Sequence, residues 1–553
     1  MWKLWSRRLM FICCIIVAVL VITILHEITS HETGNFPLNE QAQPTAFKAN
    51  NAFRNILQYF QPDIKCKDSL LAADPSFSVI YNRGRRSVFL GEDIIFTIVL
   101  YNGYGNPKDT GGDHLRARLF NHSLGAYTPG SIEDHANGTY TVTFPSLWIG
   151  NAEIEVEVLY THEIIGTAIR LRKTWDFSDV FAIFVDNNYT EITTCGPDYK
   201  TVHRYSKTSK VCHFAYWNTS QQWFCGRPAN NMLCKHWTSI TRFLENYTKG
   251  ISQCEEKLSR IDGQTNIPSN ITLKILPRKM DDAFEGTNIS CLNYNNTKLW
   301  FQDKPSGYFY NNKWIIAHCK GIEHLDGECL RNKTMLFWGD STLYQWYVYF
   351  KKKLLIDSYS VCKSSIGTHG WLNPETCTFH KLNLTMCFKG HNIPVSSFTK
   401  KGLYDMFKII SFEEFIKSYS NSRNEVLLVL NLYVHLQQYD YSHFAANMLE
   451  IKRSLERIFK TKTNVKVFFK LPHTYRRWKD KEWKLRQNDY IGFIFTHIMR
   501  KTFNGLYDKI TVLDQKDATI AKRSFDIHPP EIIVRGMVFQ FLSYVCKSDS
   551  NKI

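Results

Sequence analysis

The sequence predicts a multidomain chain in which an antiparallel β-sandwich precedes an α/β domain with a parallel sheet. Its 553 residues allow two or three domains, at roughly 150 residues for each. Hydrophobic residues make up 44% of the chain and charged residues 22%, a composition typical of folded domains rather than of disorder. Two hydrophobic patterns, one on each side of residue 300, distinguish the two domains.

The first pattern is a series of short runs rich in Val, Ile, Phe and Tyr. Several runs alternate polar and apolar residues, as residues 152–159 do, and turn clusters such as "HANGTY" separate them. Short strands at this spacing predict an immunoglobulin-like antiparallel sandwich. No catalytic group of residues occurs here, so we expect a spacing or binding role. The six runs are residues 76–82, 93–101, 115–120, 139–144, 152–160 and 179–186.

After residue 300 the pattern changes to strands that alternate with helices. This alternation implies a parallel sheet with helical crossovers. In such sheets, ligands bind beyond the carboxyl ends of the strands. The predicted strands are residues 335–338, 426–430, 465–469 and 510–513, and the predicted helices are residues 342–355, 443–459, 489–503 and 530–545.

The N-terminus has the pattern of a membrane anchor. Lys3, Arg7 and Arg8 precede the uncharged apolar residues 9–25, a run that is short for a spanning helix but can cross a thin bilayer. A cleaved signal peptide is the alternative, but the run is longer than a usual signal core and no A-x-A-like site follows it. By the positive-inside rule we expect a type II signal-anchor at residues 9–25. Residues 1–8 would then be a cytoplasmic tail, residues 26–70 a stem, and the rest of the chain lumenal.

Glycosylation sequons support a lumenal chain. Ten N-x-S/T sequons follow the apolar run, too many to arise by accident in all cases. They are Asn121, Asn137, Asn188, Asn218, Asn246, Asn270, Asn288, Asn295, Asn332 and Asn383.

The cysteines point to the same compartment. Of 15 cysteines, Cys13 and Cys14 lie in the apolar run and thirteen follow it. In an oxidising lumen most of the thirteen should pair, and because thirteen is odd at least one is free or pairs between chains. Residues 191–300 contain six of them. Cys212-His213 and Cys234-Lys235-His236 lack the paired spacing of a zinc site, so we expect disulfides and no metal.

The net charge of +17 has two interpretations. A basic surface attracts anionic donors or acidic glycans, but short runs such as residues 351–353 fit an ordinary solvated surface equally well, and we favour the latter. A lumenal location excludes nucleic acid as a partner.

The stretch "FWGDSTLYQW" (residues 337–346) places Ser341 on a tight turn after a predicted strand. A serine becomes a nucleophile when a base accepts its proton and a third group orients that base. His435 and His528 both follow predicted strands. His528 stands in "SFDIHPPE", with Asp526 two residues before it. A GDS tripeptide and single histidines are common in inert proteins, so the residues by themselves leave a catalytic site and a purely structural turn equally open.

Two longer stretches carry a family resemblance. "ECLRNKTMLFWGDSTLYQW" and, some 190 residues later, "DIHPPEIIVRGMVFQFLSYVC" resemble the PC-esterase domain, a member of the GDSL/SGNH-like group that includes plant wall-polysaccharide O-acetyltransferases. The whole layout resembles the neurexophilin and PC-esterase domain family. This resemblance implies a neurexophilin-like sandwich at residues 71–190, a cysteine-rich glycosylated linker at residues 191–300 and an SGNH-like PC-esterase domain at residues 301–553.

The resemblance also implies roles for the site residues. Ser341 would be the nucleophile and His528 the base. Gly339 and Asp340 would frame the turn, with the Ser341 N–H in an oxyanion hole, and Asn431 and Gly367 hold the positions nearest to the group's other oxyanion residues.

The acid and one neighbour depart from the group's pattern. The group often has D-x-x-H, whereas Phe525 holds the position three before His528 and Asp526 lies only two before it. Asp526 is the first choice for the acid, with Asp514 and Asp517 as alternatives. Tyr344 stands where the family commonly has an arginine, which favours altered or lost activity.

The function implied by the resemblance is O-acetyl transfer to sugar hydroxyls, with sialic acid as one acceptor. No tightly bound cofactor is expected, and acetyl-CoA is a suitable donor. The partners would be a glycan or glycoprotein acceptor and the membrane, with the chain in the Golgi membrane, or secreted if the apolar run is cleaved. A catalytically inactive neurexophilin-like glycoprotein that binds a cell-surface receptor is the first alternative, and a carbohydrate O-acetylesterase is the second.

Overall fold

The computed structural model describes most of the chain beyond the predicted anchor. The described residues are 65–82, 84–174, 180–214, 223–242, 251–259, 265–278, 289–325, 327–356, 358, 360–364, 374–391, 404–405, 411–419, 423–476, 485 and 487–547. The predicted tail, the anchor at residues 9–25 and most of the stem lie outside them. Within the described ranges, no helix is both long and apolar enough to cross a bilayer.

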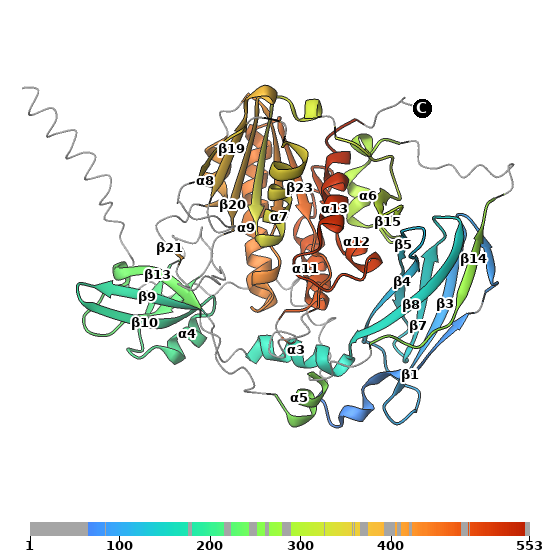
Figure 1. Cartoon of the computed structure of the whole chain (residues 1–553). Coiled ribbons are helices and arrows are strands. Elements are labelled where there is room, and N and C mark those ends of the chain that lie inside the picture. The colour runs from blue at the N-terminus through green and yellow to red at the C-terminus, as the bar shows by residue number, and fades with distance from the viewer. Residues whose placement is uncertain are drawn as a thin grey trace, which may run out of the picture.

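Two sheets, antiparallel except for the parallel pair β14–β2 at one edge, pack face to face in the N-terminal part of the chain (Figure 1). Inward-facing side chains such as Phe96 and Ile98 from one sheet and Leu119 and Val156 from the other belong to one buried cluster, as the alternation of polar and apolar residues predicts. We call this unit the β domain. Its first sheet has the order β1 (Ala73–Asn82), β3 (Asp93–Asn102), β7 (Thr139–Pro145), β6 (Ser131–Asp134). Its second has the order β16 (Lys313–Ile316), β15 (Gly307–Tyr310), β5 (Ala126–Pro129), β4 (His114–Asn121), β8 (Gly150–Tyr160), β14 (Thr272–Leu276), β2 (Ser87–Phe89).

The β domain differs from the expected one in which segments build it. Five of the six predicted runs are strands of its two sheets, but the sixth is not, because β9 (Val180–Asp186) pairs in a separate sheet after helix α3 (His162–Thr174). Conversely, β14 comes from the predicted linker, and the β15–β16 hairpin comes from the start of the predicted esterase domain. The β domain is therefore built from segments that are separated in sequence, and no single boundary along the chain divides it from the C-terminal domain.

A small six-stranded sheet forms much of the cysteine-rich segment, on the left in Figure 1. The disulfides Cys195–Cys225 and Cys212–Cys234 lie in or beside this sheet. The strand order is β11 (Val211–His213), β12 (Phe224–Gly226), β10 (Tyr189–Gly196), β9, β13 (Trp237–Arg242), β21 (Tyr404–Asp405).

The disulfides confirm the prediction that most of the cysteines after the apolar run are paired. Twelve of the thirteen cysteines after the apolar run are paired, and Cys387 is free and buried. The remaining pairs are Cys66–Cys254, Cys291–Cys319, Cys329–Cys546 and Cys362–Cys377. Because Cys212 and Cys234 share one bond, they are not thiolate ligands. Disulfides of this number fit the secretory pathway.

The described sequons are accessible. Six of the seven described asparagines are exposed, and Asn121 is half-buried. Asn218, Asn246 and Asn288 lie outside the described residues.

The C-terminal domain is built on a seven-stranded mixed sheet. Five strands (β20, β17, β22, β23, β24) are parallel neighbours, and two antiparallel strands extend one edge. The order is β18 (Ser360–Ser364), β19 (Glu375–Phe379), β20 (Leu384–Gly390), β17 (Lys333–Gly339), β22 (Glu425–Asn431), β23 (Val465–Lys470), β24 (Ile510–Leu513). The four predicted strands are confirmed as β17, β22, β23 and β24. The strands β18 to β20 were missed because Thr, Lys and Gly interrupt their apolar residues.

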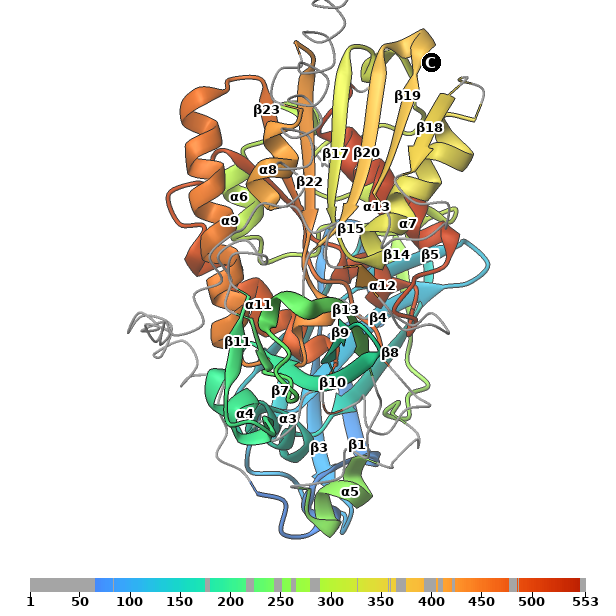
Figure 2. The ribbon, with the colours of Figure 1, turned by 90° about the vertical axis from the view of Figure 1, so that its left-hand side faces the viewer.

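Helices cover both faces of this sheet (Figure 2). Helix α7 (Ser341–Tyr349) packs with α13 (Glu531–Ser543), and α9 (Tyr441–Thr461) packs with α11 (Asp489–Thr502). The chain leaves β17 toward β20 and later returns to β17's other side as β22. The carboxyl end of β17 is therefore a topological switch point, the place where such folds bind ligands.

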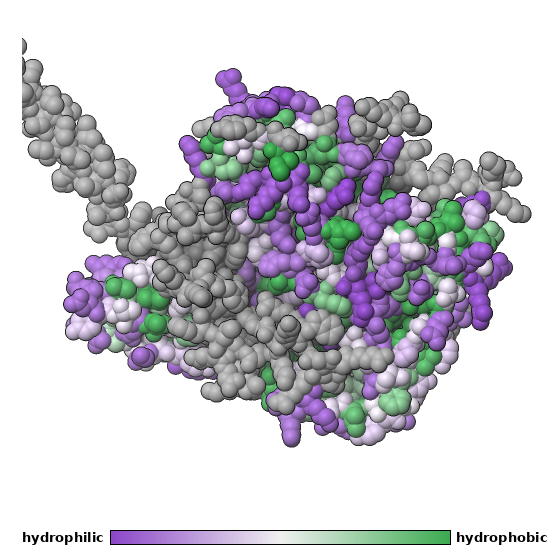
Figure 3. Space-filling view, in the orientation of Figure 1, coloured by the Kyte–Doolittle hydropathy of each residue, from purple (hydrophilic) through white to green (hydrophobic). Residues whose placement is uncertain are grey.

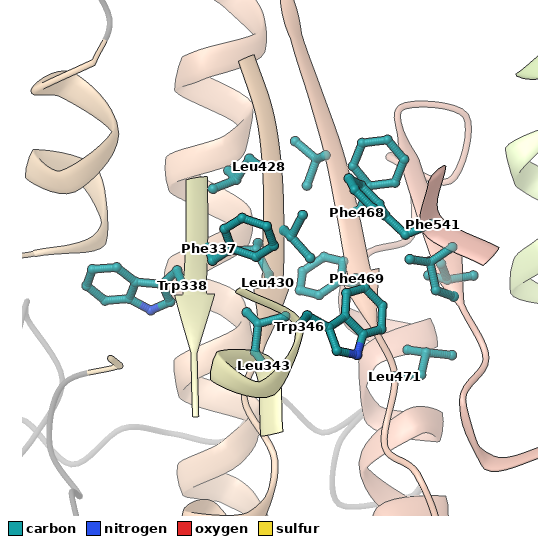
Figure 4. Close-up of a cluster of buried hydrophobic side chains, with 14 of the residues drawn as sticks. Phe337, Trp338, Leu343, Trp346, Leu428, Leu430, Phe468, Phe469, Leu471 and Phe541 are labelled. Carbon is teal, nitrogen blue, oxygen red and sulfur yellow. The ribbon is translucent and has the colours of Figure 1, made fainter. Parts of the chain in front are cut away.

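The interior strands are buried on both faces. On one face, Phe337 and Phe468 pack beneath Trp346 and Phe541 (Figure 4). On the other, Trp338 packs on Phe412 and Phe415 of α8 (Phe412–Lys417), with ring centroids 5.5 and 5.3 Å away. Burial on both faces explains why these strands are continuous apolar runs.

Candidate active site

Ser341 is the first residue of α7, directly beyond the carboxyl end of β17. The Asp340 side chain caps the helix by accepting a hydrogen bond from the Thr342 N–H at 2.9 Å. Gly339 is required because a Cβ there would lie 2.5 Å from the Asn431 carbonyl oxygen. The predicted turn at Gly339 and Asp340 is thus present, and Asn431 supplies its close neighbour.

His528 lies against this turn although it is distant in sequence. Its Nε2 is 2.8 Å from the Ser341 Oγ. Ser341 is half-buried and His528 is exposed. At this distance the serine hydroxyl can donate a hydrogen bond to the imidazole nitrogen. Through this contact a general base accepts the serine proton.

Three hydrogen bonds hold the segment that carries His528. The carbonyl of Phe525 accepts from the Arg476 N–H at 2.8 Å. The carbonyl of Ile527 accepts from His473 Nε2 at 2.9 Å, and that of Pro529 accepts from Gln345 Nε2 at 3.2 Å. The carbonyls of residues 525, 527 and 529 therefore all accept hydrogen bonds from the C-terminal domain.

A buried polar chain connects the serine turn to this segment. Asp340 accepts from the Thr342 hydroxyl at 2.7 Å, and Lys470 Nζ donates to the same hydroxyl at 3.0 Å. Lys470 Nζ also lies 3.3 Å from His473 Nδ1. His473 then donates to the carbonyl of Ile527, next to His528. The chain spans from one member of the Ser341–His528 pair to the other.

Burial shifts the ionisation of this chain. Removal from water lowers the pKa of Lys470 to about 8, against the attraction of Asp340. Burial and the neighbouring Lys470 lower the pKa of His473 well below its usual range. A neutral His473 with its proton on Nε2 accepts from Lys470 and donates to Ile527, which satisfies both ring nitrogens.

The predicted acids do not contact His528. Within the described residues, the Asp526 side chain is exposed and makes no hydrogen bond or ion pair. Asp514 pairs with Lys516 at 2.9 Å, and Asp517 accepts from the Ser306 N–H at 2.7 Å. The role of Asp526, or of either alternative, therefore stays a prediction without a supporting contact.

The structure describes two of the groups predicted to bind the oxyanion, the Ser341 N–H and the Asn431 amide. The Ser341 N–H has no hydrogen-bond partner among the described residues, and it points out from a helix N-terminus, where negative charge is stabilised. The Asn431 amide is buried and donates to the Lys470 carbonyl at 3.0 Å, and its Oδ1 accepts from the Thr342 hydroxyl at 3.4 Å, so it supports the turn, and its oxyanion role stays a prediction. Gly367 lies outside the described residues.

Two further sequence candidates lie near the turn. The alternative base His435 is buried, and its Nδ1 is 2.8 Å from His391 Nε2, so the structure pairs Ser341 with His528 and not with His435. Tyr344, the position that departs from the pattern of the resemblance, packs on Phe388 with ring centroids 4.9 Å apart.

Lys470, His473 and Gln345 were missed from the sequence. A charged residue at the end of the apolar run "VKVFFK", at the edge where ligands bind, was the available signal for Lys470. No local signal distinguishes His473 or Gln345, because their partners are residues 527 and 529.

A cavity of about 780 Å³ lies elsewhere, between the β15–β16 hairpin and α13. Trp314 and Arg535 are among its lining residues, and neither Ser341 nor His528 is. This cavity is therefore separate from the serine turn.

Two family models match the chain. Residues 101–256 match the neurexophilin model, and residues 314–546 match the model of the NXPE family member 4-like C-terminal domain. The chain belongs to the neurexophilin and PC-esterase domain family. The second match contains both Ser341 and His528, so the pair lies within the matched C-terminal domain.

Solved structures show weaker likenesses to this family member. A mutant of Axe2, an acetyl-xylooligosaccharide esterase from Geobacillus Stearmophilus, is 14% identical over 39% of this chain and 96% of its own, with a TM-score of 0.21. The Lin-41 filamin domain is 11% identical over 17% of this chain and 84% of its own, with a TM-score of 0.14. Likenesses at these TM-scores support no further conclusion.

Proposed function

We propose that this protein transfers acetyl groups to sugar hydroxyls by way of Ser341. The supporting observation is the 2.8 Å contact between Ser341 Oγ and His528 Nε2 at the carboxyl end of β17. The proposal includes an SGNH-like α/β domain and an immunoglobulin-like β domain in a Golgi membrane protein anchored by residues 9–25.

The first half of the reaction acetylates the serine. His528 Nε2 accepts the Ser341 proton while Oγ attacks the acetyl carbonyl of a donor such as acetyl-CoA. The Ser341 N–H stabilises the resulting oxyanion. The bond to the donor sulfur breaks, His528 returns its proton to the departing thiol, and acetyl-Ser341 remains.

The second half reverses these roles. His528 takes the proton of a sugar hydroxyl, the sugar oxygen attacks acetyl-Ser341, and the serine leaves with the proton from His528. The product is an O-acetylated sugar, of which sialic acid is one example, and the enzyme returns to its starting state.

Hydrolysis is the second candidate. His528 is exposed, so water can replace the sugar hydroxyl as acceptor, which would make the protein an O-acetylesterase. A binding glycoprotein without activity is the alternative from another class, which the Tyr344 position favours and the intact Ser341–His528 contact disfavours.

The test compares glycans from cells that lack the protein with those from cells that express it. Mass spectrometry of released glycans should show added acetyl groups with the wild type and none with Ser341→Ala at matched level and location. A loss of existing acetyl groups would identify the esterase. No change with the wild type, in cells supplied with donor and acceptor, would reject both activities in favour of binding.

A further inference from the structure

We propose that the β domain positions His528 through Arg523, so that both domains build the active site. Arg523 lies five residues before His528, at the end of helix α12 (Lys516–Ala521). Its φ of 53° is in the left-handed region, which residues with side chains rarely adopt. The chain turns here from α12 into the segment that carries His528.

Acidic side chains of strand β8 hold the Arg523 guanidinium. Its Nη2 and Nε both donate to Glu157 Oε1, at 3.0 and 3.2 Å, and its Nε also lies 2.9 Å from Glu155 Oε1 in an ion pair. Asn266 accepts a further contact at 3.0 Å. Glu157 is 4% exposed, whereas the Arg523 side chain is 32% exposed, so solvent screens the pair in part, and loss of Arg523 would leave a buried carboxylate without its charge partner.

Phe525 joins the same junction. Its ring lies beneath two guanidinium groups, 5.3 Å from that of Arg523 and 6.0 Å from that of Arg116 in strand β4. Its carbonyl is the one that accepts from the Arg476 N–H. Phe525 is thus held by the β domain through its side chain and by the α/β domain through its backbone, three residues before His528.

The β domain also holds helix α12. Arg118 of β4 donates to the carbonyl of Ala521 at 3.4 Å and pairs with Glu155. The helix packs against β4, β5 and β15 of the β domain (Figure 1). On the face in Figure 3, hydrophilic residues are dense along this junction. Contacts between the two domains are therefore present where the His528 segment begins.

Such ion pairs could also serve only to join the two domains. The two roles differ in one consequence. A positioning role predicts that weakening the Arg523 contacts loosens the 524–528 backbone, whereas simple cohesion predicts lower overall stability without a selective change there.

Hydrogen–deuterium exchange on the full lumenal chain separates these outcomes and needs no substrate. Arg523→Gln should speed exchange of the amides of residues 524–528 by about tenfold. Arg523→Lys keeps the charge but cannot donate from two nitrogens to Glu157 while it pairs with Glu155, so it should give an intermediate rate. Glu157→Gln is the milder variant if Arg523→Gln does not fold.

The matched control is Glu255→Gln. Glu255 is buried and forms a bidentate pair with Arg170 of α3 at 2.7 and 2.8 Å, and hydrogen bonds also join it to Ser252, so none of these contacts involves the His528 segment. Its loss should lower the melting temperature without faster exchange at residues 524–528. Unchanged exchange there in both Arg523→Gln and Glu157→Gln would overturn the proposal, and so would equal loosening by the control.

A kinetic measurement rests on the proposed function. For acetyl transfer, Arg523→Gln should lower kcat about tenfold and change KM by less than about threefold, because Arg523 positions the base and does not touch the substrate. If the wild type shows no turnover, the proposed function fails, while the exchange measurement still decides the role of the β domain.

Discussion

Replacing Ser341 by Ala should abolish turnover and leave the fold intact. The substitution removes one half-buried hydroxyl and its hydrogen bond to His528. A hydrogen bond contributes about 1 kcal/mol to stability, but the exposed His528 can bond to water instead. Alanine also favours the helix by about 0.5 kcal/mol over serine, and the Asp340 cap does not use the removed atom. The free energy of unfolding should therefore change by less than about 0.5 kcal/mol.

The effect on turnover should be far larger. Loss of a serine nucleophile costs on the order of 10³-fold or more in kcat, which corresponds to about 4 kcal/mol in activation free energy. His528→Ala should be nearly as damaging, and the double variant little worse than either, because the two residues act as one unit.

The assay is glycan O-acetylation by each variant at matched level and location, together with chemical denaturation of the purified chain. Ser442→Ala is a suitable control, because Ser442 is also a half-buried serine just inside a helix whose Asp cap is Asp440. It should retain full activity. If the wild type is active and Ser341→Ala keeps that activity, Ser341 is only a turn residue and the mechanism is wrong.

Three further outcomes are expected. Asp526→Asn should lower turnover less than about tenfold, since Asp526 does not contact His528; a loss comparable to that of His528→Ala would place it in the triad. Lys470→Met should reduce turnover by about tenfold or more. It should not lower the free energy of unfolding at pH 7. Burial lowers the pKa of Lys470 from 10.5 to about 8, so a protonated Lys470 destabilises the folded state. That penalty is complete below pH 8 and vanishes above 10.5, so denaturation against pH should show the wild type gaining stability relative to Lys470→Met across this interval, and parallel curves would contradict the pKa. Thiol labelling of the denatured, non-reduced protein should modify Cys387 and few others of the thirteen cysteines after residue 25, and labelling of most of these would refute the six disulfides.

Local patterns in the sequence are enough to predict several elements of the fold. The apolar runs of β17, β22, β23 and β24 are long enough to predict strands, because strands buried on both faces must be continuously apolar. The turn at Gly339 and Asp340 and the start of α7 follow from local sterics and capping. The odd cysteine count likewise required a thiol outside the intramolecular pairs, and Cys387 is the one in the structure.

Tertiary structure decided what depends on contacts between distant segments. Residues 180–186 have a strand pattern but join the small sheet rather than the sandwich, since pairing depends on which edges meet and not on the strand's own residues. Local sequence patterns likewise do not predict the pairing of Ser341 with His528 rather than His435, the Lys470–His473 contact, or the ion pair between Glu157 and Arg523. Each joins residues brought together only by the packing of separate elements, and no periodicity or spacing within one segment encodes such a contact.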